Sequence, residues 1–412
     1  MTGTPLNLPN EETKMSKRAK AVIGAAYGDE GKGLITDFLA AAGATVVART
    51  NGGAQAGHTV VRADGTRHVF SHIGSGAFAG APTHFTRFFV AHPMFFLDER
   101  NRVEALGGNV RASADPRTTV TTPYDIMINQ IAEESRGASR HGSCGMGVGE
   151  TVERCLRPDL AITVGDLHGS RLALVSRLER IRKEWVGERL RTLGIEEVPP
   201  RFARLLGDDG VMRRFLDDCS AFADRVVPLP DDLLPDGVLF EGAQGLLLDQ
   251  DYGAFPHVTR SNTGVMNMAF VARGAGIAEI DAVYVTRTYT TRHGAGPLAH
   301  WGEDMSYAEI EDPTNIHNDW QGSLRAAPLD LDILGAAIRH DLGRGEGVAV
   351  TASLALTCLD QLGDAATVYA DGRKRRISGD GLAAELPRYT GLAVSAVSSG
   401  PSRAGVVPCP RL

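Results

Sequence analysis

The chain has 412 residues, of which 43% are hydrophobic and 23% are charged, as in ordinary soluble globular proteins. This length and composition exclude a mini-protein, a disulfide scaffold and a mainly disordered chain. Its 43 lysines and arginines against 50 aspartates and glutamates leave a net charge of −7, so no overall positive field is available to bind nucleic acid. The five cysteines are odd in number and widely spaced, which favours reduced thiols and a cytoplasmic location.

The first residues do not resemble a targeting segment. Residues 1–18 contain prolines and charges and are not followed by the apolar run of a signal peptide, so we expect a disordered tail. No window approaches 18 consecutive apolar residues, which argues against a membrane span. Residues 19–412 are expected to form a single α/β domain, although two domains also fit this length.

The predicted elements begin with two strands that each run into a glycine-rich loop. Residues 21–24 are apolar, the loop 28–33 follows, and residues 34–42 are expected to be helical. Residues 45–49 form a second apolar run, which leads into the polar loop 51–58. Because both loops follow strands, we expect them to border one crevice.

The rest of the chain contains further apolar strand candidates and one long region with a helical pattern. Further apolar strand candidates are residues 237–240, 281–285, 348–351 and 366–369. Their continuous apolar character favours a mostly parallel central sheet covered by helices. Residues 172–193 have the apolar spacing of an exposed amphipathic helix, so residues from roughly 100 to 235 are expected to form a helical insertion. The predicted fold class is therefore α/β, with a P-loop-like nucleotide-binding fold.

The first glycine loop has the residue types of an anion site. It reads Gly28-Asp29-Glu30-Gly31-Lys32-Gly33. Glycines expose backbone N–H groups, the start of a helix adds a partial positive charge, and Lys32 would contact a phosphate. The loop differs from a Walker A loop, because Ala26 and Gly33 replace the first glycine and the Mg²⁺-binding Ser or Thr. The carboxylates of Asp29 and Glu30 are costly there unless they serve a cation or a proton transfer. A tight turn with a solvated lysine is the alternative interpretation.

Two further polar residues follow predicted strands. His58 ends the second loop, and an imidazole beside a phosphate loop can polarise or protonate a leaving oxygen. Gln244 follows the strand at 237–240, and its amide both donates and accepts, which suits a base or a carbonyl. A structural histidine and a surface glutamine in a turn are the alternatives.

Taken together, these segments resemble the adenylosuccinate synthetase family, whose ligases join L-aspartate to carbon 6 of a 6-oxopurine nucleotide at the expense of a nucleoside triphosphate. The resemblance runs in one order over most of the chain, and residues 150–235 support it least. The matching stretches are residues 28–33, 57–59, 240–245, 258–262, 291–297 and 398–401.

The resemblance implies a chemical role for the polar residues of these loops. Asp29 would take the proton from N1 of the purine, and the resulting O6 oxyanion would attack the γ-phosphate. His58 would neutralise charge on the leaving diphosphate, Lys32 would add fixed positive charge, and Gln244 would hold O6. Mg²⁺ would bridge the phosphates, held by Asp29 and the carbonyl of Gly57. The aspartate amine would then displace phosphate from carbon 6.

The remaining contacts are also implied by the resemblance. Nucleotide binding is expected from Gly28, Glu30, Gly31, Gly33, Gln55, Ser143, Cys144, Thr259, Asp360, Ser399 and Gly400. Arg325 and Arg292 are expected to hold the aspartate carboxylates. Family members act as homodimers in which an arginine reaches the partner's nucleotide, and Arg154 and Arg157 are the nearest candidates. A solvated surface position is the alternative for both.

The chain departs from the family pattern around the purine, the aspartate and the base of the triphosphate. The loop 143–149 lacks the family's Arg and Pro, and residues 322–327 keep one arginine where the family has four. Residues 357–360 read Thr-Cys-Leu-Asp, without the lysine that stacks on guanine. These changes resemble a diverged viral branch that converts (d)GMP to 2-amino-(deoxy)adenylosuccinate, although some viral members replace Asp29 by Ser. We expect a (d)GMP-type acceptor with GTP, ATP or dATP as donor, and IMP with GTP is the alternative.

Two other classes of protein compete with a ligase. A nucleotide-binding regulator has no use for a base, so the joint presence of Asp29, Lys32, His58 and Gln244 argues against it. A switch GTPase is disfavoured because neither an intact Thr-Lys-x-Asp motif nor the Walker A Ser or Thr is present.

Overall fold

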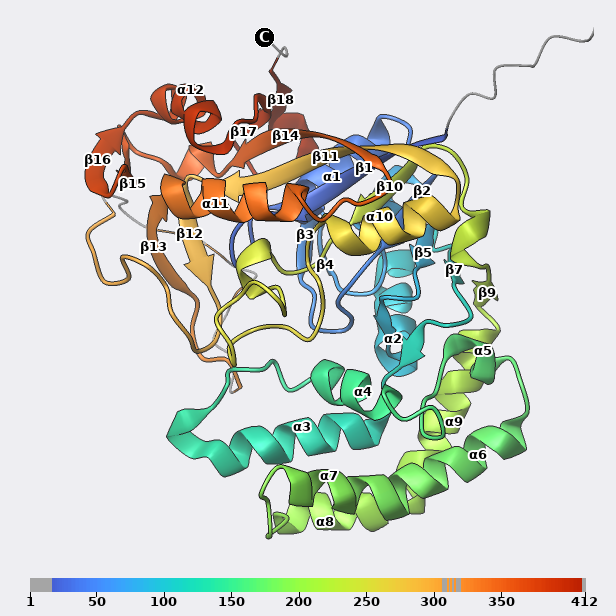
Figure 1. The fold of residues 1–412 in the computed structure, drawn as a ribbon. Coiled ribbons are helices and arrows are strands. Elements are labelled where there is room, and N and C mark those ends of the chain that lie inside the picture. Colours follow the sequence, from blue (N-terminus) through green and yellow to red (C-terminus); the bar gives the residue numbers. More distant parts are fainter. Residues whose placement is uncertain (1–16, 306–309, 311, 313–314, 316–319, 410–412) are drawn as a thin grey trace, which may run out of the picture.

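The structure is a computed structural model that describes residues 17–305, 310, 312, 315 and 320–409 (Figure 1). Most of the predicted tail, residues 1–16, lies outside the described residues. Lys17 and Arg18, which we assigned to the tail, instead begin the first strand and pair with the strand at residues 277–287.

A ten-stranded sheet forms the centre of the molecule, in the order β18-β17-β14-β11-β1-β10-β2-β5-β7-β9. All neighbouring strands are parallel except β17 and β18. The strands are β1 (Lys17–Gly24), β2 (Val46–Arg49), β5 (Thr83–Phe85), β7 (Ala112–Ala114), β9 (Val226–Pro228), β10 (Val238–Glu241), β11 (Ile277–Arg287), β14 (Ala349–Thr357), β17 (Val394–Ser398) and β18 (Val406–Pro408). The mostly parallel α/β sheet predicted from the apolar runs is therefore confirmed.

Helices cover both faces of this sheet. They are α1 (Lys32–Ala41), α10 (Val265–Gly274), α11 (Leu331–Leu342) and α12 (Gly379–Thr390). Alternate residues of β1 enter different cores: Ala21 and Ile23 pack with α10 and α11, whereas Val22 packs with Leu34 and Ile35 of α1. Because side chains alternate between the two faces and both faces are covered, the strands read as continuous apolar runs.

A second, smaller sheet contains one of the predicted strands. It consists of β12 (Tyr289–Arg292), β13 (Arg325–Asp330), β15 (Ala366–Ala370) and β16 (Arg373–Ile377), in that order. The candidate at 366–369 is β15, which pairs with β13 and β16 and not with the central sheet. Four of the five residues of β15 are buried, like those of a central strand, so its apolar run does not indicate which sheet it joins.

The predicted helical region lies below the central sheet in Figure 1, and its apolar core also includes side chains from the preceding segment, residues 60–96. Its helices are α2 (Pro93–Ala105), α3 (Pro123–Arg136), α4 (Val148–Cys155), α5 (Val164–Leu167), α6 (Arg171–Arg180), α7 (Val186–Thr192), α8 (Pro200–Gly207) and α9 (Asp209–Ala223). The helix expected at 172–193 is formed by α6 and α7, joined by a π-helical turn, Ile181–Trp185. The region also contributes β7 and β9 to the edge of the large sheet, so it is fixed to the sheet at more than one point.

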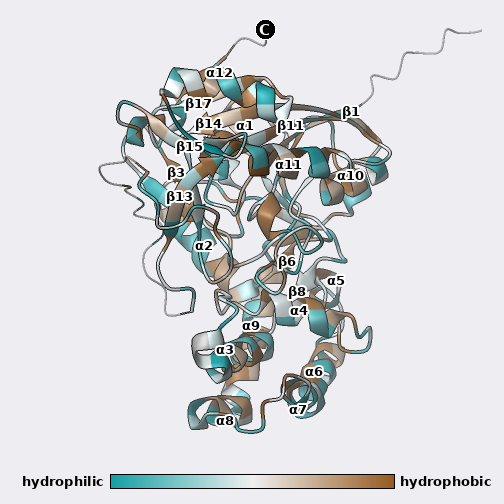
Figure 2. Ribbon diagram, turned by 60° about the vertical axis from the view of Figure 1, so that its left-hand side comes forward, coloured by the Kyte–Doolittle hydropathy of each residue, from teal (hydrophilic) through white to brown (hydrophobic). Residues whose placement is uncertain are grey.

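Two short pairs of strands complete the fold. They are β3 (His58–Val61) with β4 (Arg67–Phe70), and β6 (Val90–Ala91) with β8 (Thr119–Val120). Figure 2 shows hydrophilic and hydrophobic residues side by side along α6, α7 and α8, as expected for helices with one face in solvent. Among the described residues, no helix has both the length and the apolar character needed to cross a membrane.

Candidate active site

The loops that follow β1, β2, β14 and β17 meet at the carboxyl edge of the central sheet. They border a cavity of about 620 Å³. Its lining includes Asp29, Lys32, Gly57, His58, Asp360 and Gly400. The two glycine loops therefore border one crevice, as the sequence predicts, and the loops near 360 and 400 belong to the same crevice.

The glycine loop predicted to bind phosphate, residues 28–33 (the phosphate loop below), contains backbone conformations that favour glycine. Gly28 has φ of 102° and Asp29 has φ of 62°, both in the left-handed region. An aspartate in this region costs about 1 kcal/mol, and such conformations are concentrated at functional sites. With this backbone conformation, Asp29 lines the cavity.

The side chain of Glu30 makes hydrogen bonds with residues in and next to the loop. Its Oε1 accepts hydrogen bonds from the backbone N–H groups of Ala26 at 3.0 Å and Gly28 at 2.7 Å. Its Oε2 accepts one from Lys32 Nζ at 2.6 Å, and both side chains of this ion pair are 3% exposed. Glu30 thus shapes the loop and positions Lys32, which accounts for a carboxylate in a phosphate loop without a metal or a proton transfer.

Neighbouring strands hold the carbonyl oxygens of the phosphate loop. Thr357 Oγ1 donates to the carbonyl of Glu30 at 2.7 Å, and Arg287 Nε donates to the carbonyl of Asp29. Carbonyls that point towards the strands leave the opposite side of such a loop to its N–H groups, the arrangement that binds anions. Sequence analysis missed Arg287, although a charged residue at the carboxyl end of a buried strand could have indicated it.

His58 is held by a buried carboxylate. Its Nδ1 lies 2.6 Å from Oε1 of Glu241, and Glu241 is completely buried. Burial by itself raises the pKa of Glu241, but the positive charges of Arg49 and His58 and the hydrogen bond from Ser75 outweigh it and lower the pKa to about 2. Burial also lowers the pKa of His58, against the opposing effect of Glu241. Sequence analysis gave no role to Glu241, because its partner lies 183 residues away.

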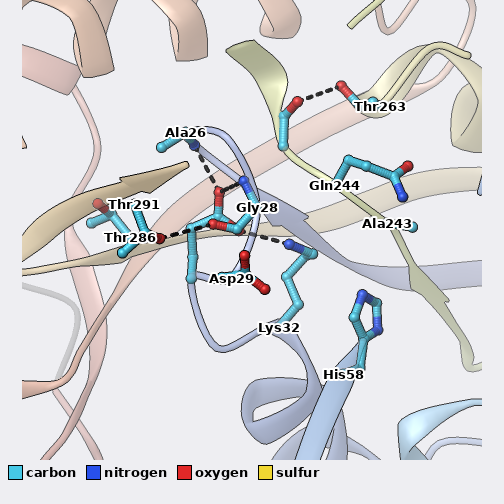
Figure 3. A network of polar contacts seen from close by, with 12 residues as sticks. Ala26, Gly28, Asp29, Lys32, His58, Ala243, Gln244, Thr263, Thr286 and Thr291 are labelled. Carbon is cyan, nitrogen blue, oxygen red and sulfur yellow. Dashed lines mark hydrogen bonds and ion pairs between the residues drawn. The ribbon is translucent and has the colours of Figure 1, made fainter. Parts of the chain in front are cut away.

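Gln244 lies beside the phosphate loop, next to Gly28. It too has a left-handed backbone, with φ of 58°. Asn51 holds this turn: its Nδ2 donates to the carbonyl of Ala243 and the N–H of Ala243 donates to its Oδ1, both at 2.8 Å. Figure 3 shows that Asp29, Lys32, His58 and Gln244, which come from three different loops, lie close to one another.

The residues present fit the predicted magnesium site. Among the described residues, no group of three or more His, Cys, Asp and Glu side chains could hold a metal ion by itself. Mg²⁺, however, is usually bound by one or two carboxylates together with substrate phosphates. Asp29 and Gly57 line the same cavity and supply a carboxylate and a backbone carbonyl, which is the ligand type that Mg²⁺ prefers.

Other predicted nucleotide contacts lie next to the cavity or apart from it. The cavity is lined by Ser398, the neighbour of Ser399. Oε1 of Gln55 is buried and has no hydrogen-bond partner in the part of the chain that the structure describes. The Oγ of Ser143 accepts a hydrogen bond from Asn129 on α3 at 2.9 Å. Cys144 is next to it, and Thr259 donates its backbone N–H to Leu248 at 2.9 Å. Ser143, Cys144 and Thr259 are not among the residues that line the cavity.

The two predicted aspartate-binding arginines face each other across an antiparallel pair of strands. Arg292 of β12 is the register partner of Arg325 of β13. Arg292 is buried and donates to the carbonyls of Ala295, Pro297 and His257. Arg325 is half-buried and donates through Nη2 to Gly294 and Gly296. Nε, Nη1 and Nη2 of Arg292 thus each donate to a backbone carbonyl, whereas Arg325 makes both of its backbone hydrogen bonds through one nitrogen, Nη2.

The two arginines considered for the dimer contact have different surroundings. Arg154 is completely buried and holds Asp125 through Nε at 2.9 Å, so the interpretation as a solvated surface residue is wrong for it. Its Nη1 and Nη2 donate to the carbonyls of Leu160 and Val120 at 2.7 Å. Arg157 is exposed and pairs with Asp159 at 3.2 Å.

Comparison with known proteins identifies the family. The family model described as adenylosuccinate synthetase matches residues 21–368. The chain belongs to the adenylosuccinate synthetase family. This membership places it among ligases that form a carbon–nitrogen bond, a family that uses a nucleoside triphosphate and Mg²⁺.

Individual relatives agree with this assignment. Adenylosuccinate synthetase of Clostridium beijerinckii is 32% identical over 367 residues, which cover 83% of this chain and 77% of that protein. The enzyme of the same name from Chromohalobacter salexigens is 34% identical over 294 residues, which cover 67% of this chain and 63% of that protein.

Solved structures show the same fold. The fully ligated adenylosuccinate synthetase from Plasmodium falciparum has a TM-score of 0.71 at 17% identity, covering 96% of this chain and 100% of that chain. Succinoaminodeoxyadenylate synthetase of cyanophage S-2L, bound to dGMP and dATP, has a TM-score of 0.58 at 16% identity, covering 96% of each chain.

Proposed function

We propose that the chain joins L-aspartate to carbon 6 of a 6-oxopurine nucleoside monophosphate through a 6-phosphoryl intermediate. The observation that carries this proposal is the position of Asp29 and His58, which come from separate loops and line one cavity with the phosphate loop. A carboxylate and an imidazole on either side of a migrating phosphoryl group supply the base and the charge stabilisation that this reaction needs.

Asp29 and Gln244 act on the purine. Asp29 takes the proton from N1, which places negative charge on O6, and the amide of Gln244 donates a hydrogen bond to that oxygen. The clamp of Asn51 on the backbone of Ala243 supports this role, because it fixes the turn that carries Gln244. The O6 oxyanion then attacks the γ-phosphorus, and the bond to the β-phosphate oxygen breaks.

Lys32 and His58 act on the phosphates. Both side chains line the cavity, and each is held by a buried carboxylate, Glu30 and Glu241 respectively. Lys32 offsets the negative charge that accumulates on the diphosphate as the γ-phosphoryl group leaves, and His58 does so in its imidazolium form, with Nδ1–H donated to Glu241 and Nε2–H donated to the phosphates. Mg²⁺, when bound by Asp29 and the Gly57 carbonyl, supplies further positive charge to the phosphates. Phosphate then leaves carbon 6 as the aspartate amine attacks.

The acceptor we favour is GMP or dGMP, which gives 2-amino-(deoxy)adenylosuccinate. The support is the set of departures around the purine and the aspartate: Cys144 and Met146 stand in a loop without the family's arginine, and Arg325 is alone where the family has four arginines. The cyanophage S-2L synthetase, whose structure contains dGMP and dATP, has the same fold. IMP is the alternative, favoured by the name of the relatives, adenylosuccinate synthetase, and by the presence of Asp29.

The triphosphate and the aspartate are assigned to different places. The cavity beside Lys32 receives the triphosphate, with its base near Asp360 and Cys358, which line the far part of the same cavity. Cys358 stands where the family carries a lysine, so GTP, ATP and dATP are all candidate donors. Arg325 holds the aspartate carboxylates, and Arg292 is its register partner on the neighbouring strand. We further propose that the protein acts as a cytoplasmic homodimer and does not bind nucleic acid, as its net charge of −7 suggests.

A matrix of substrates tests the proposal. IMP, GMP, dGMP and dIMP are each combined with ATP, dATP and GTP, and released phosphate is measured with and without L-aspartate. We expect phosphate release that requires aspartate and one class of monophosphate, with the succinyl product found by mass spectrometry. Triphosphate hydrolysis that proceeds equally well without either co-substrate would exclude a ligase.

A further inference from the structure

Glu241 is a buried carboxylate that the proposed reaction does not use. It is the last residue of β10, it is completely buried, and it contacts His58 and not the cavity. Its Oε1 lies 2.6 Å from Nδ1 of His58 and accepts a hydrogen bond from Ser75 Oγ at 2.5 Å. Its Oε2 accepts the backbone N–H of Ser75 at 3.0 Å. A carboxylate with this many donors has one defined position.

The register of the central sheet places a positive charge behind Glu241. Arg49 ends β2 and is the register partner of Glu241 on the adjacent parallel strand. Its Nε lies 3.8 Å from Oε2 of Glu241, and the arginine is completely buried. The Nη1 of Arg49 donates to the carbonyls of His72 and Ile73, both at 3.4 Å, whereas its Nε and Nη2 have no hydrogen-bond partner among the described residues. Since a buried charge needs an opposite charge nearby, Arg49 stabilises Glu241 as a carboxylate.

We infer that Glu241 is a positioning residue for His58: it accepts a hydrogen bond from Nδ1–H, fixes the plane of the ring and leaves Nε2 as the nitrogen that meets the phosphates. His58 lines the cavity, and its other ring nitrogen is engaged by Glu241. Which nitrogen of a histidine acts on a substrate is set by the hydrogen bond that the other nitrogen makes. Arg49 and Ser75 act one step further away, because they hold Glu241.

This inference rests on the proposed function for the role of His58, but its geometry can be tested without turnover. In protein labelled with ¹⁵N-histidine, we expect the His58 ring to carry a hydrogen-bonded proton on Nδ1, at a downfield proton frequency. The resonance is assigned by its loss in His58→Ala. An upfield move of this proton in Glu241→Gln supports the inference, whereas an unchanged resonance overturns it.

A double-mutant cycle tests the catalytic consequence. Glu241→Gln should lower kcat by about a hundredfold, the effect expected when a residue that orients a reacting group is lost, and should change KM for the triphosphate less than threefold. In a His58→Ala background the same substitution should change kcat less than threefold, because the ring that Glu241 positions is absent. An equal loss in both backgrounds, or a Glu241→Gln enzyme within threefold of the parent, overturns the inference.

A matched control and a milder variant separate positioning from folding. Glu99 is also a buried glutamate beside histidines, and its Oε1 and Oε2 accept the backbone N–H groups of Ser71 and His72 at 2.7 Å, without contact with His58. We expect Glu99→Gln to keep kcat within threefold of the parent. Thermal denaturation of Glu99→Gln and Glu241→Gln checks that both variants are folded. If Glu241→Gln does not fold, Ser75→Ala replaces it in the cycle, with an expected loss of about tenfold that is absent in His58→Ala.

The two proposals fail in distinguishable ways. If the unmodified protein shows no phosphate release that depends on aspartate, the proposed function fails, and the histidine resonance alone decides the role of Glu241. If the unmodified protein is active and the cycle is additive, the proposed function stands and the positioning role is rejected.

Discussion

Glu30 and Lys32, two residues apart in the phosphate loop, form an ion pair that solvent barely reaches. The Nζ of Lys32 lies 2.6 Å from Oε2 of Glu30, and each side chain is 3% exposed. The same carboxylate caps two backbone N–H groups of the loop, so one side chain sets both the loop conformation and the position of the lysine. In the proposed function, the charge that meets the phosphates is therefore held in place before any nucleotide binds.

Glu30→Gln should destabilise the protein and weaken triphosphate binding. Removing one partner of a buried pair leaves the other charge uncompensated, and we expect a loss of about 3 kcal/mol in the free energy of unfolding, measured by urea denaturation. Lys183 and Glu179 provide the control, because they form a pair of the same length, 2.6 Å, with side chains 66% and 27% exposed. Glu179→Gln should cost less than about 1 kcal/mol. Equal losses would show that burial of the Glu30 pair has no energetic consequence.

Gly24→Ala should distort the same loop by steric overlap. A Cβ at this position would lie 2.3 Å from Oε2 of Glu30, 2.6 Å from the carbonyl of Gln244 and 2.7 Å from Nζ of Lys32. Carbon atoms do not approach oxygen or nitrogen atoms this closely, so the Glu30–Lys32 ion pair must move. We therefore expect the affinity for the triphosphate, measured by calorimetry, to fall at least tenfold. Gly274→Ala at the end of α10, where a Cβ meets nothing within 4 Å, should leave that affinity unchanged.

Asp29→Asn tests the base. An asparagine cannot take the N1 proton, so we expect at least a hundredfold loss of product formation with the folded structure retained, measured by mass spectrometry and circular dichroism. Asp64, which lies on an exposed turn and is 56% exposed, is the matched control, and Asp64→Asn should have no effect on turnover. Turnover of Asp29→Asn within tenfold of the parent would refute the role of Asp29 as base.

The order of elements and the position of the loop proposed to bind phosphate follow from the sequence, because they depend on neighbouring residues. An apolar run such as 21–24 predicts a strand covered on both faces, and glycines directly after it predict a loop at the sheet edge. The predictions at Asp29 and His58 therefore come from local patterns, and the structure brings both residues to one cavity.

The partners of these residues could not be predicted in the same way, because they are set by strand pairing and helix packing. Glu241 meets His58 and Arg49 only because β10 lies next to β2 in the sheet, although some 190 residues separate the two strands in the chain. Arg154 looks like a surface arginine in the sequence, and its buried partner, Asp125, lies 29 residues away on another helix. Nothing in the local pattern of either residue indicates the other.

Asp341 should make the stability of the protein depend on pH. It lies in α11 and accepts hydrogen bonds from the N–H of Val265 at 3.0 Å and from the hydroxyl of Tyr284 at 2.8 Å. Burial raises the pKa of Asp341 from 3.8 to about 6, although these two hydrogen bonds oppose the change. The folded state therefore binds the proton more tightly than the unfolded state, and this contribution to stability is present below pH 4 and lost as pH rises through 6.

Asp341→Asn removes this titration and should flatten the corresponding part of the pH profile. The change in pKa corresponds to about 3 kcal/mol, so relative to the variant the parent should lose up to that amount of unfolding free energy between pH 4 and pH 7. Urea denaturation of both proteins at several pH values gives the difference in unfolding free energy. The contributions of the other carboxyl groups cancel in this difference, because these groups titrate in both proteins. A difference that is independent of pH would contradict the raised pKa.

Arg325 and Arg292 face each other across β12 and β13, but their substitutions should have different consequences. Arg325 is half-buried and uses one nitrogen for the backbone, so Arg325→Ala should raise KM for aspartate about a hundredfold, the loss of a charged pair, and leave KM for the triphosphate unchanged. Arg292 is buried and donates to three carbonyls, so Arg292→Ala should mainly lower the unfolding free energy, by about 3 kcal/mol. Arg339, which donates to the carbonyl of Tyr389, is the control, and Arg339→Ala should leave KM for aspartate unchanged. If Arg325→Ala keeps KM for aspartate within threefold of the parent, the carboxylates are held by other residues.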